Sequence, residues 1–376
     1  MSAIGPAPAG ADIGFRSLPA GLDTPCLVVD LDRLTLNIAR LQVELGRRGI
    51  ALRPHAKTHK SVRIARLQIE AGAGGLTVGT LGEAEVFAAA GITDLFLAYP
   101  IWARGPKAER LRALHGAAPG LRVGVDSADG AERLASAMRG AGHPLHVLVE
   151  IDPGNGRTGV VGSAAAVEVA RAARRAGLAV DGVFSHGGHA YRPGAAAAAG
   201  ADEVRTLTEA ASALEADGSE VAVVSAGSTP TSLTAATGRV NEIRAGTYVL
   251  GDRQQVVLGA IPPEGCALAV ATTVVSTFPD RVVLDAGAKS LTKDRPDWLE
   301  GFGAIAGYPE LVIERLSDYH GVVAVPTGAA RPALGEVVAV IPNHVCPVVD
   351  LFDRFTVLAA DGSIEEWPVD ARGRSG

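Results

Sequence analysis

Short apolar, β-branched segments alternate with alanine-rich helical patterns through the first two-thirds of this 376-residue chain, and this alternation constrains its fold most. Eight segments have the character of buried strands: Ile50–Arg53, Leu76–Gly79, Leu95–Ala98, Arg122–Val125, His146–Glu150, Gly182–Ser185, Ala222–Ser225 and Glu242–Ala245. Continuous apolar strands that are separated by helices indicate a parallel sheet. Eight such units predict an α/β fold with a TIM-like (β/α)8 barrel, and a doubly wound open sheet is the alternative.

The pattern changes near residue 255, where helical periodicity largely gives way to alternating runs. These runs are Leu268–Thr277, Arg281–Leu284, Gly321–Val325, Gly335–Ile341, Val345–Leu351 and Phe355–Leu358. Alternation of apolar and polar residues is typical of antiparallel strands with one buried face. We therefore expect a barrel over residues 22–255 and a mostly antiparallel β domain over 256–376, with residues 1–21 packing on the β domain.

Charge and composition exclude several classes of protein. The net charge of −6 argues against a chain built on nucleic-acid contacts. No apolar run approaches the ~20 residues of a membrane span, and the N-terminus lacks the basic start and apolar run of a secretory signal. Three cysteines are too few and too widely spaced for a disulfide framework. These features favour a cytoplasmic protein without a membrane or nucleic-acid partner.

Reactive side chains follow most of the expected barrel strands, and the active site of such a barrel lies at the carboxyl ends of its strands. Lys57 stands in the segment RPHAKTHK, after the first strand. An amine surrounded by other cations becomes a better nucleophile, which favours a Schiff-base lysine. A basic, solvated turn is the alternative that the residues leave open.

Two neighbouring loops carry small hydroxyl residues and glycine. SAGSTPT, Ser225–Thr231, follows the seventh strand, and IRAGT, Ile243–Thr247, includes the end of the eighth. Backbone N–H groups and hydroxyls in such segments can bind a phosphate, and these two loops are the favoured phosphate site of the fold. Each segment taken alone could be an ordinary loop.

The segment NHVCP places His344 and Cys346 two residues apart. On the expected strand both side chains would share one face, so that imidazole and thiolate could bind one divalent ion. This donor pair suits zinc best. His320 is a possible third group, and a core cysteine beside an unrelated histidine is the alternative interpretation.

An ordered set of motifs resembles the D-threonine aldolase and D-serine dehydratase family over nearly the whole chain. The matching segments are DTPCLVVDLDRL, RPHAKTHK, VEIDPGNGRTG, NEIRAGTYVLGD, LDAGAKSLTKD, the His320–Gly321 pair and PNHVCPVVDLFD. The resemblance implies a pyridoxal-phosphate (PLP) enzyme of the alanine-racemase-like fold, fold type III. It also implies a homodimer.

The same resemblance implies a role for each matching residue. Lys57 is expected to bind PLP as a Schiff base, and Arg244 to face the pyridine nitrogen. Arg157 is expected to organise the lysine side of the cofactor. Tyr191 and the preceding His186 and His189 are expected to meet the cofactor ring. The phosphate cradle comprises Ser225, Gly227, Ser228, Thr229, Gly246 and Thr247. His344 and Cys346 match the metal pair, with His320 nearby.

The metal pair separates the subfamilies, because His-x-Cys resembles the dehydratases whereas the better-known aldolases carry His-x-Asp. We therefore expect a lyase of D-3-hydroxy amino acids that resembles D-serine dehydratase and gives a keto acid and ammonia. It would use PLP and a divalent metal, zinc first and manganese or magnesium otherwise. The alternative is cleavage of D-threonine type to glycine and an aldehyde, with His186 or His189 as base. Two further alternatives are less favoured. An amino-acid racemase would need a tyrosine opposite Lys57, for which this chain has no match. Non-catalytic PLP carriers resemble a lone barrel, whereas this chain continues into a second domain.

Overall fold

The computed structural model describes residues 12–376, so residues 1–11 of the expected 1–21 extension lie outside the described residues. The chain divides into two compact units. The barrel unit comprises Arg40–Lys57, Ile64–Gly246 and Gly373–Gly376. Among the described residues, the β unit comprises 12–39, Thr58–Arg63 and Thr247–Arg372.

The barrel unit contains eight parallel strands in one sheet, in the order β2-β9-β8-β7-β6-β5-β4-β3. They are β2 (Ala51–Leu52), β3 (Leu76–Val78), β4 (Leu95–Pro100), β5 (Arg122–Val125), β6 (His146–Ile151), β7 (Ala179–Ser185), β8 (Val223–Ala226) and β9 (Glu242–Ile243). A parallel bridge between His55 and Thr77 joins the two ends of this order, so the sheet curls round until its edges meet. The expected eight-stranded barrel is confirmed.

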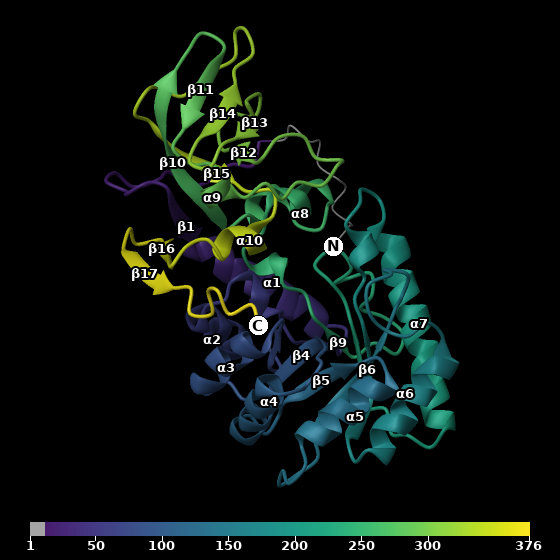
Figure 1. The fold of residues 1–376 in the computed structure, drawn as a ribbon. Helices are drawn as coiled ribbons and strands as arrows, with labels where there is room; N and C mark the ends of the chain where they lie inside the picture. The colour runs from purple at the N-terminus through teal and green to yellow at the C-terminus, as the bar shows by residue number, and fades with distance from the viewer. Residues whose placement is uncertain (1–11) are drawn as a thin grey trace. The chain divides into compact units, whose positions relative to one another are not determined.

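Helices follow most of these strands and cover the outside of the sheet (Figure 1). They are α2 (Val62–Glu70), α3 (Leu81–Ala89), α4 (Pro106–Ala117), α5 (Ala128–Ala137), α6 (Ser163–Arg175) and α7 (Ala196–Ala216), with 3₁₀ turns η1 (Ala56–Thr58) and η2 (Gly188–Ala190). Inside the barrel, Phe96, Leu148 and Phe184 form a buried cluster. The rings of Phe96 and Phe184 meet edge to face, with centroids 4.9 Å apart. This apolar layer lies beneath the polar residues of the candidate site.

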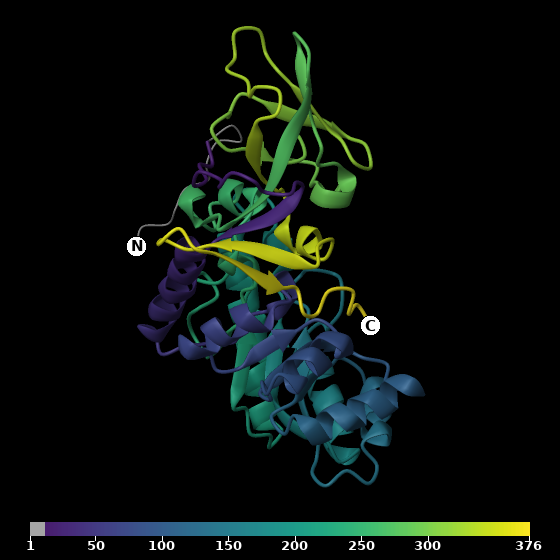
Figure 2. The same cartoon turned by 90° about the vertical axis from the view of Figure 1, so that its left-hand side faces the viewer.

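The β unit is built on a second sheet whose main path is β13-β14-β11-β10-β1-β16-β17, with β15 pairing β10 and β12. Its strands are β1 (Cys26–Asp30), β10 (Leu268–Thr277), β11 (Arg281–Leu284), β12 (Ala304–Ile305), β13 (Val312–Leu316), β14 (Gly321–Ala324), β15 (Val337–Ile341), β16 (Arg354–Leu358) and β17 (Ile364–Pro368). Every pairing is antiparallel except that of β1 with β16. Figure 2 shows the purple β1 alongside the yellow β16 and β17.

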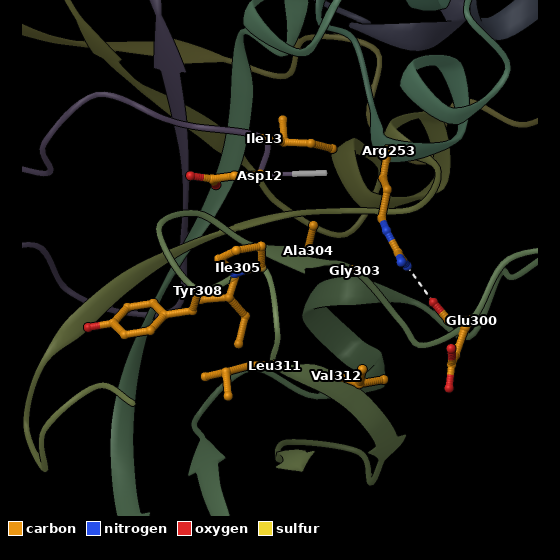
Figure 3. A pocket seen from close by; sticks show the side chains of 11 residues that line it. Asp12, Ile13, Arg253, Glu300, Gly303, Ala304, Ile305, Tyr308, Leu311 and Val312 are labelled. Carbon is orange, nitrogen blue, oxygen red and sulfur yellow. Dashed lines mark hydrogen bonds between the residues drawn. The ribbon is translucent and has the colours of Figure 1, made fainter. Parts of the chain in front are cut away.

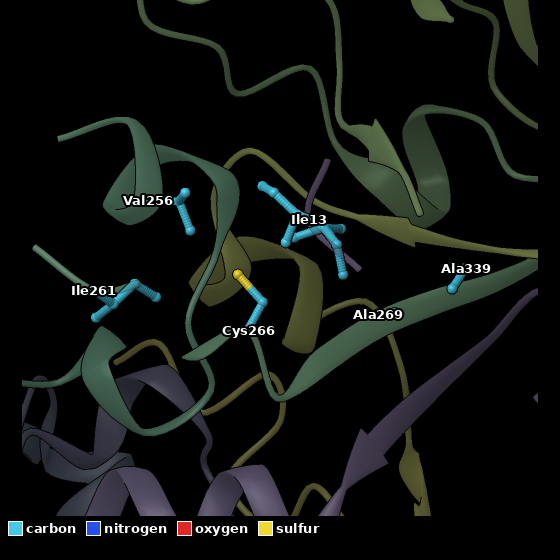
Figure 4. Close-up of a cluster of buried hydrophobic side chains, with 7 residues drawn as sticks. Ile13, Val256, Ile261, Cys266, Ala269 and Ala339 are labelled. Carbon is cyan, nitrogen blue, oxygen red and sulfur yellow. The ribbon is translucent and has the colours of Figure 1, made fainter. Parts of the chain in front are cut away.

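Short helices complete the β unit: α8 (Arg253–Val257), α9 (Ala288–Leu291), α10 (Val345–Val349), η3 (Thr247–Val249) and η4 (Pro263–Gly265). Helix α1 (Leu31–Gly46) begins in the β unit and ends in the barrel unit. Figure 4 shows a core cluster of the β unit, in which Ile13 packs with Cys266, Val256 and Ile261. Within the described residues, no helix is long and apolar enough to cross a membrane.

One predicted strand of the β unit is wrong. Val345–Leu351 was expected to be extended, but Val345–Val349 forms helix α10, with His344 as its N-cap residue. Pro347 explains the difference, because proline lacks the N–H of a strand ladder and fits the first turn of a helix. The argument that His344 and Cys346 share a strand face therefore fails, and their relation depends on the helix start instead.

Candidate active site

The predicted reactive residues of the barrel unit lie beyond the carboxyl ends of its parallel strands. Lys57 lies in η1 after β2, Arg157 after β6, His186 after β7, and Arg244 directly after β9. The positive charges of Lys57, Arg157 and Arg244 act on His186 together with burial, and they lower the pKa of His186 well below its usual range. The structure therefore brings these four residues, which are distant in sequence, within electrostatic reach of one another.

Lys57 has an exposed side chain at the mouth of the barrel. Its backbone N–H donates to Nδ1 of His55 at 3.4 Å, a hydrogen bond within the turn that carries the lysine. A Cβ on Gly79 would lie 3.7 Å from the Cβ of Lys57, so the loop after β3 packs closely against the lysine. Lys60, a further cation of the same motif, forms an ion pair with Asp350 at 2.8 Å.

Arg244 is buried inside the barrel, where its guanidinium lies over two aromatic rings. The Cζ atom is 5.7 Å from the ring centroid of Phe96 and 5.3 Å from that of Phe184. Nη1 donates to Ser225 Oγ at 2.6 Å, and Nη2 donates to the carbonyl oxygen of Ser185. Burial lowers the pKa of Arg244, although Glu242 and other carboxylates oppose this effect. The arginine is thus held rigidly at the carboxyl ends of β7 and β8.

Glu242 was missed by the sequence interpretation and organises this arginine. Its Oε1 accepts a hydrogen bond from Ser225 Oγ at 2.6 Å, and its Oε2 accepts one from Arg53 Nε at 2.7 Å. The positive charge of Arg53 and the bond from Ser225 outweigh burial and lower the pKa of Glu242. The Ser225 hydroxyl therefore links Glu242 to Arg244. The visible signal was a charged residue inside an otherwise apolar strand pattern.

The loop after β8 has a conformation fixed by internal hydrogen bonds. Gly227 adopts a φ of +96°, and its N–H donates to Glu203 Oε1 at 3.0 Å. The N–H of Ser228 donates to Thr231 Oγ1 at 3.0 Å, and Ser232 Oγ donates to the carbonyl of Thr229 at 2.9 Å. Ser228 and Thr229 are buried at this bend.

The segment after β9 offers uncommitted donors. Across the described residues, neither the backbone N–H of Gly246 nor that of Thr247 is donated to a protein acceptor. Gly246 ends the long central segment of the barrel unit, and Thr247 begins the adjoining segment of the β unit. Two successive free N–H groups form the kind of backbone arrangement that binds an anion.

Arg157 lies in a tight loop after β6 that its sequence explains. The carboxylate of Asp152 accepts N–H bonds from Gly154 at 2.9 Å and from Asn155 at 2.7 Å, which closes an Asx turn. Gly156 follows with a φ of +68°. Arg157 itself is exposed, and its guanidinium has no acceptor within residues 12–376. Its positive charge is thus available for a ligand.

Glu150 was also missed and lies at the end of β6. It is 2% exposed; Oε1 accepts a bond from Thr158 Oγ1 at 2.8 Å, whereas the buried Oε2 has no partner in the described chain. Leu148 belongs to the cluster inside the barrel, and the period-2 alternation of a strand places Glu150 on the same inner face. Burial raises the pKa of Glu150, against the charges of Arg157 and Arg244.

This raised pKa predicts a pH-dependent effect of Glu150→Gln in the cofactor-free protein. A carboxyl whose pKa is higher in the folded state binds more protons in that state than in the unfolded chain. The stability of the folded protein therefore falls as the pH rises above 4.5, the ordinary pKa of a glutamate. Glu150→Gln should therefore raise the melting temperature at pH 7, with the gain shrinking toward pH 4. Melting curves across this range, with exposed Glu168→Gln as the control, measure it. A loss of stability at pH 7 would contradict the assignment.

The two other predicted histidines of the barrel unit differ in their surroundings. His186 is half-buried, and its ring centroid lies 6.5 Å from that of Tyr191. His189 lies beside Asp202 of α7, with Nε2 and Oδ2 3.4 Å apart. Burial and the neighbouring cations therefore disfavour the charged form of His186, whose pKa is lowered.

His344 and Cys346 lie together in the β unit at the start of α10. Asp294 Oδ2 is 2.6 Å from His344 Nδ1, which leaves Nε2 for another partner. Burial alone would lower the pKa of His344, but Cys346, Asp294 and Asp252 outweigh it and raise that pKa to about 11. Three acidic side chains thus act on one imidazole at the start of α10.

Two threonines contact the Cys346 thiol. Sγ donates to Thr58 Oγ1 at 3.2 Å, and Thr247 Oγ1 lies 3.8 Å from Sγ. Thr58 and Thr247 directly follow Lys57 and Gly246 in the chain. Asp252 Oδ2 accepts the N–H of Val345 at 3.0 Å, and burial raises the pKa of Asp252 to about 6. The start of α10 is therefore fixed by the N-cap residue of α8.

His320 is exposed in the turn between β13 and β14. Among residues 12–376, no group of three or more histidine, cysteine, aspartate or glutamate side chains has the arrangement of a metal site. A cation at His344 and Cys346 would thus need water or substrate to complete its shell.

A pocket in the β unit is lined mostly by apolar side chains (Figure 3). Arg253 reaches into it, but Nη1 already donates to the carbonyl of Glu300 and to Asn343 Oδ1. The pocket thus lacks the nucleophile and uncommitted cations of the barrel mouth.

Comparison with known proteins decides the family. The family model described as "Alanine racemase, N-terminal domain" matches residues 29–254, and that described as "Putative serine dehydratase domain" matches 267–358. The chain is 37% identical to D-threo-3-hydroxyaspartate dehydratase of Delftia sp. (strain HT23), over 92% of this chain and 97% of the relative. The chain belongs to the D-threonine aldolase and D-serine dehydratase family. Its membership supports PLP as the cofactor.

Both reactions of the D-threonine aldolase and D-serine dehydratase family occur among its relatives. D-threonine aldolase of Arthrobacter sp is 34% identical, over 95% of this chain and 94% of the relative. A solved cysteine-to-alanine mutant of D-threo-3-hydroxyaspartate dehydratase, described as being in the metal-free form, is 35% identical with a TM-score of 0.85. It covers 93% of this chain and 97% of that one.

Proposed function

We propose that this chain is a PLP- and divalent-metal-dependent lyase that releases ammonia from D-3-hydroxy amino acids and leaves a keto acid. The observation that carries the proposal is the Cys346–His344 pair, with Asp294 on the histidine. Family membership supports the general reaction, and the thiol favours the dehydratase over the aldolase. D-serine and D-threo-3-hydroxyaspartate are the substrates to try first.

The residues at the barrel mouth fit PLP. The exposed Lys57 amine would bind its aldehyde carbon, and the N–H groups of Gly246 and Thr247 would bind its phosphate together with the loop at Ser228 and Thr229. Ser225 is committed to Glu242 and Arg244, so we assign it to positioning Arg244. The unpaired guanidinium of Arg157 would neutralise negative charge beside the lysine.

When bound, PLP supplies an electron sink for negative charge at the substrate Cα. Lys57 is the base that we assign to the Cα proton. Arg244 remains a cation and donates hydrogen bonds, so it would keep the pyridine nitrogen unprotonated. The charged form of His186 is disfavoured there, so this imidazole would add no further positive charge beside the arginines.

The donors at α10 fit a divalent cation, which when bound supplies a Lewis acid for the substrate β-hydroxyl. We assign Nε2 of His344 and Sγ of Cys346 as its ligands, because Nδ1 of His344 is occupied by Asp294. A carboxylate on the second ring nitrogen fixes the tautomer of a ligating histidine. Sulfur and nitrogen donors favour zinc, with manganese or magnesium as alternatives.

Cleavage to glycine and an aldehyde is the second candidate function, since D-threonine aldolase of Arthrobacter sp is a close relative. It needs a base for the β-hydroxyl proton, and we assign this role to His186, whose charged form is disfavoured. His189, beside Asp202, and the exposed His320 have weaker support for that role.

The products distinguish these reactions. The purified protein is supplied with D-serine, D-threonine, D-threo-3-hydroxyaspartate or D-phenylserine, with the L-isomers as controls. We expect ammonia and a keto acid from D-serine or D-threo-3-hydroxyaspartate. Glycine and an aldehyde as the main products would assign the aldolase, and racemised substrate alone would reject the lyase.

The homodimer implied by the family belongs to the same proposal. Light scattering on the purified protein should give twice the chain mass of 38.3 kDa. A monomer that is fully active would contradict it.

A further inference from the structure

Glu203 is a buried carboxylate that connects helix α7 to the loops after β7 and β8. It has no exposed surface, although α7 lies on the outside of the sheet. Its Oε1 accepts bonds from Ser185 Oγ and from the N–H of Gly227, both at 3.0 Å. Its Oε2 accepts a bond from Thr231 Oγ1 at 2.7 Å. Both ends of the Gly227–Thr231 segment are therefore bonded to one side chain.

The hydrogen bond between Glu203 and Thr231 also determines the position of Ser228. Because the hydroxyl proton of Thr231 is donated to Glu203, its lone pairs are free to accept the N–H of Ser228 at 3.0 Å. The Ser228 hydroxyl also lies 3.0 Å from that of Thr231. Glu203 thus determines where the amide and hydroxyl of Ser228 lie through one intermediate side chain.

The loop after β7 is held by the same carboxylate. A Cβ on Gly187 would come within 2.5 Å of Glu203 Oε2, so this position requires glycine for the close approach. Gly187 directly follows His186. Ser185, which donates its hydroxyl to Glu203, accepts a bond from Arg244 through its carbonyl oxygen. The carboxylate of Glu203 therefore contacts residues that adjoin His186, that bond to Arg244 and that form the Gly227–Thr231 loop.

A carboxylate beside a phosphate site needs compensation for its charge. Three donors bind its two oxygens, which disperses the negative charge among hydrogen bonds. The guanidinium of Arg244 is a nearby cation on the same network. The role of Glu203 is thus to fix the loop from behind and not to contact an anion.

We propose that Glu203 is a positioning residue that holds the Gly227–Thr231 loop in the conformation that binds the cofactor phosphate. The inference rests on the proposed use of PLP. It predicts that binding of the phosphate group depends on Glu203, whereas binding of the pyridine ring and aldehyde does not.

Comparing PLP with pyridoxal, which lacks the phosphate, tests this prediction. The full-length protein is stripped of cofactor, and the affinity for each compound is measured by absorbance titration. Glu203→Gln retains the shape but exchanges an acceptor oxygen for a donor NH₂ group. We expect it to weaken PLP binding by roughly tenfold or more, the effect of losing one charge-assisted hydrogen bond. Pyridoxal binding should change by less than about twofold.

Variants on the same helix and loop complete the design. Glu209→Gln changes an exposed carboxylate on α7 and should leave both affinities unchanged. Thr231→Val should reproduce the selective loss of PLP affinity, and Thr231→Ser should restore it, because only the hydroxyl matters. If Glu203→Gln fails to fold, this threonine pair decides the question.

Equal losses of PLP and pyridoxal affinity would overturn the proposal, since they would indicate a general structural role. Unchanged PLP affinity in Glu203→Gln or in Thr231→Val would overturn it as well. Failure of the proposed function has a different signature, namely a wild-type protein that binds neither compound.

Discussion

Lys57→Ala should abolish the covalent cofactor absorbance of the protein and lower turnover by about 10³-fold or more. The amine is the exposed nucleophile at the mouth of the barrel, and it is also the base assigned to the Cα proton. Losing both roles at once explains the size of the effect. Absorbance spectra after reconstitution with PLP and steady-state assays on D-serine measure the two consequences separately.

Lys107→Ala is the matched control, because Lys107 is an exposed lysine of α4. It should keep the wild-type spectrum and turnover. If Lys57→Ala retained a substantial fraction of wild-type turnover, its assigned role would be wrong. Added methylamine, which can replace a missing lysine amine, should restore part of the activity.

Cys346→Ala should lower the affinity for the divalent metal by at least about 100-fold and leave PLP content nearly unchanged. Removing a ligand from the metal has a greater effect than removing an outer partner, for which 10–100-fold losses are usual. The lysine, the arginines and the free N–H groups that we assign to PLP are not altered. Metal analysis and cofactor absorbance of the same preparation test both halves of the prediction.

Two further cysteine variants sharpen this result. Cys346→Asp retains an anionic ligand, so it should keep part of the activity and shift preference from zinc toward manganese or magnesium, which oxygen ligands suit. Cys26→Ala alters a half-buried cysteine of β1 and should retain full metal content. Equal metal content in Cys346→Ala and wild type would remove Cys346 from the ligand set.

The barrel strands could be predicted because they are short apolar runs separated by helical patterns. His146–Glu150 was expected and His146–Ile151 is found. Helix α4 has no such clear signal, since its apolar residues do not form a stripe along one face. The local sequence pattern is thus sufficient for strands that are continuous apolar runs and for helices with a clear apolar stripe.

Contacts between segments that are distant in the sequence were harder to predict. The pairing of β1 with β10 and β16 joins segments more than 230 residues apart, and no local pattern specifies such a partner. Helix α10 was mistaken for a strand because its sequence, VCPVV, is a short run rich in β-branched valine. A proline two residues after the first helical position was the signal against a strand.

The candidate site likewise contains residues that motifs predict and residues that only the folded chain brings together. Lys57, Arg157, Arg244 and the phosphate loops could be proposed from motifs, whereas the buried carboxylates that organise them were missed. Glu203 had a recognisable signal, since it shares the buried stripe of α7 with Leu207, Ala210 and Leu214. Asp294 ends the motif LDAGAKSLTKD, but its pairing with His344 could not be predicted, because the two residues lie 50 positions apart and meet only in the folded chain.

Ammonia release before and after removal of the metal tests the central claim most directly. The purified holoenzyme is incubated with D-serine or D-threo-3-hydroxyaspartate, then stripped with a chelator and assayed again, with metal and PLP content measured at each stage. The account predicts that ammonia and keto acid form at first, that both disappear on complete metal removal while PLP remains, and that zinc restores them. Undiminished ammonia release by metal-free protein would contradict it.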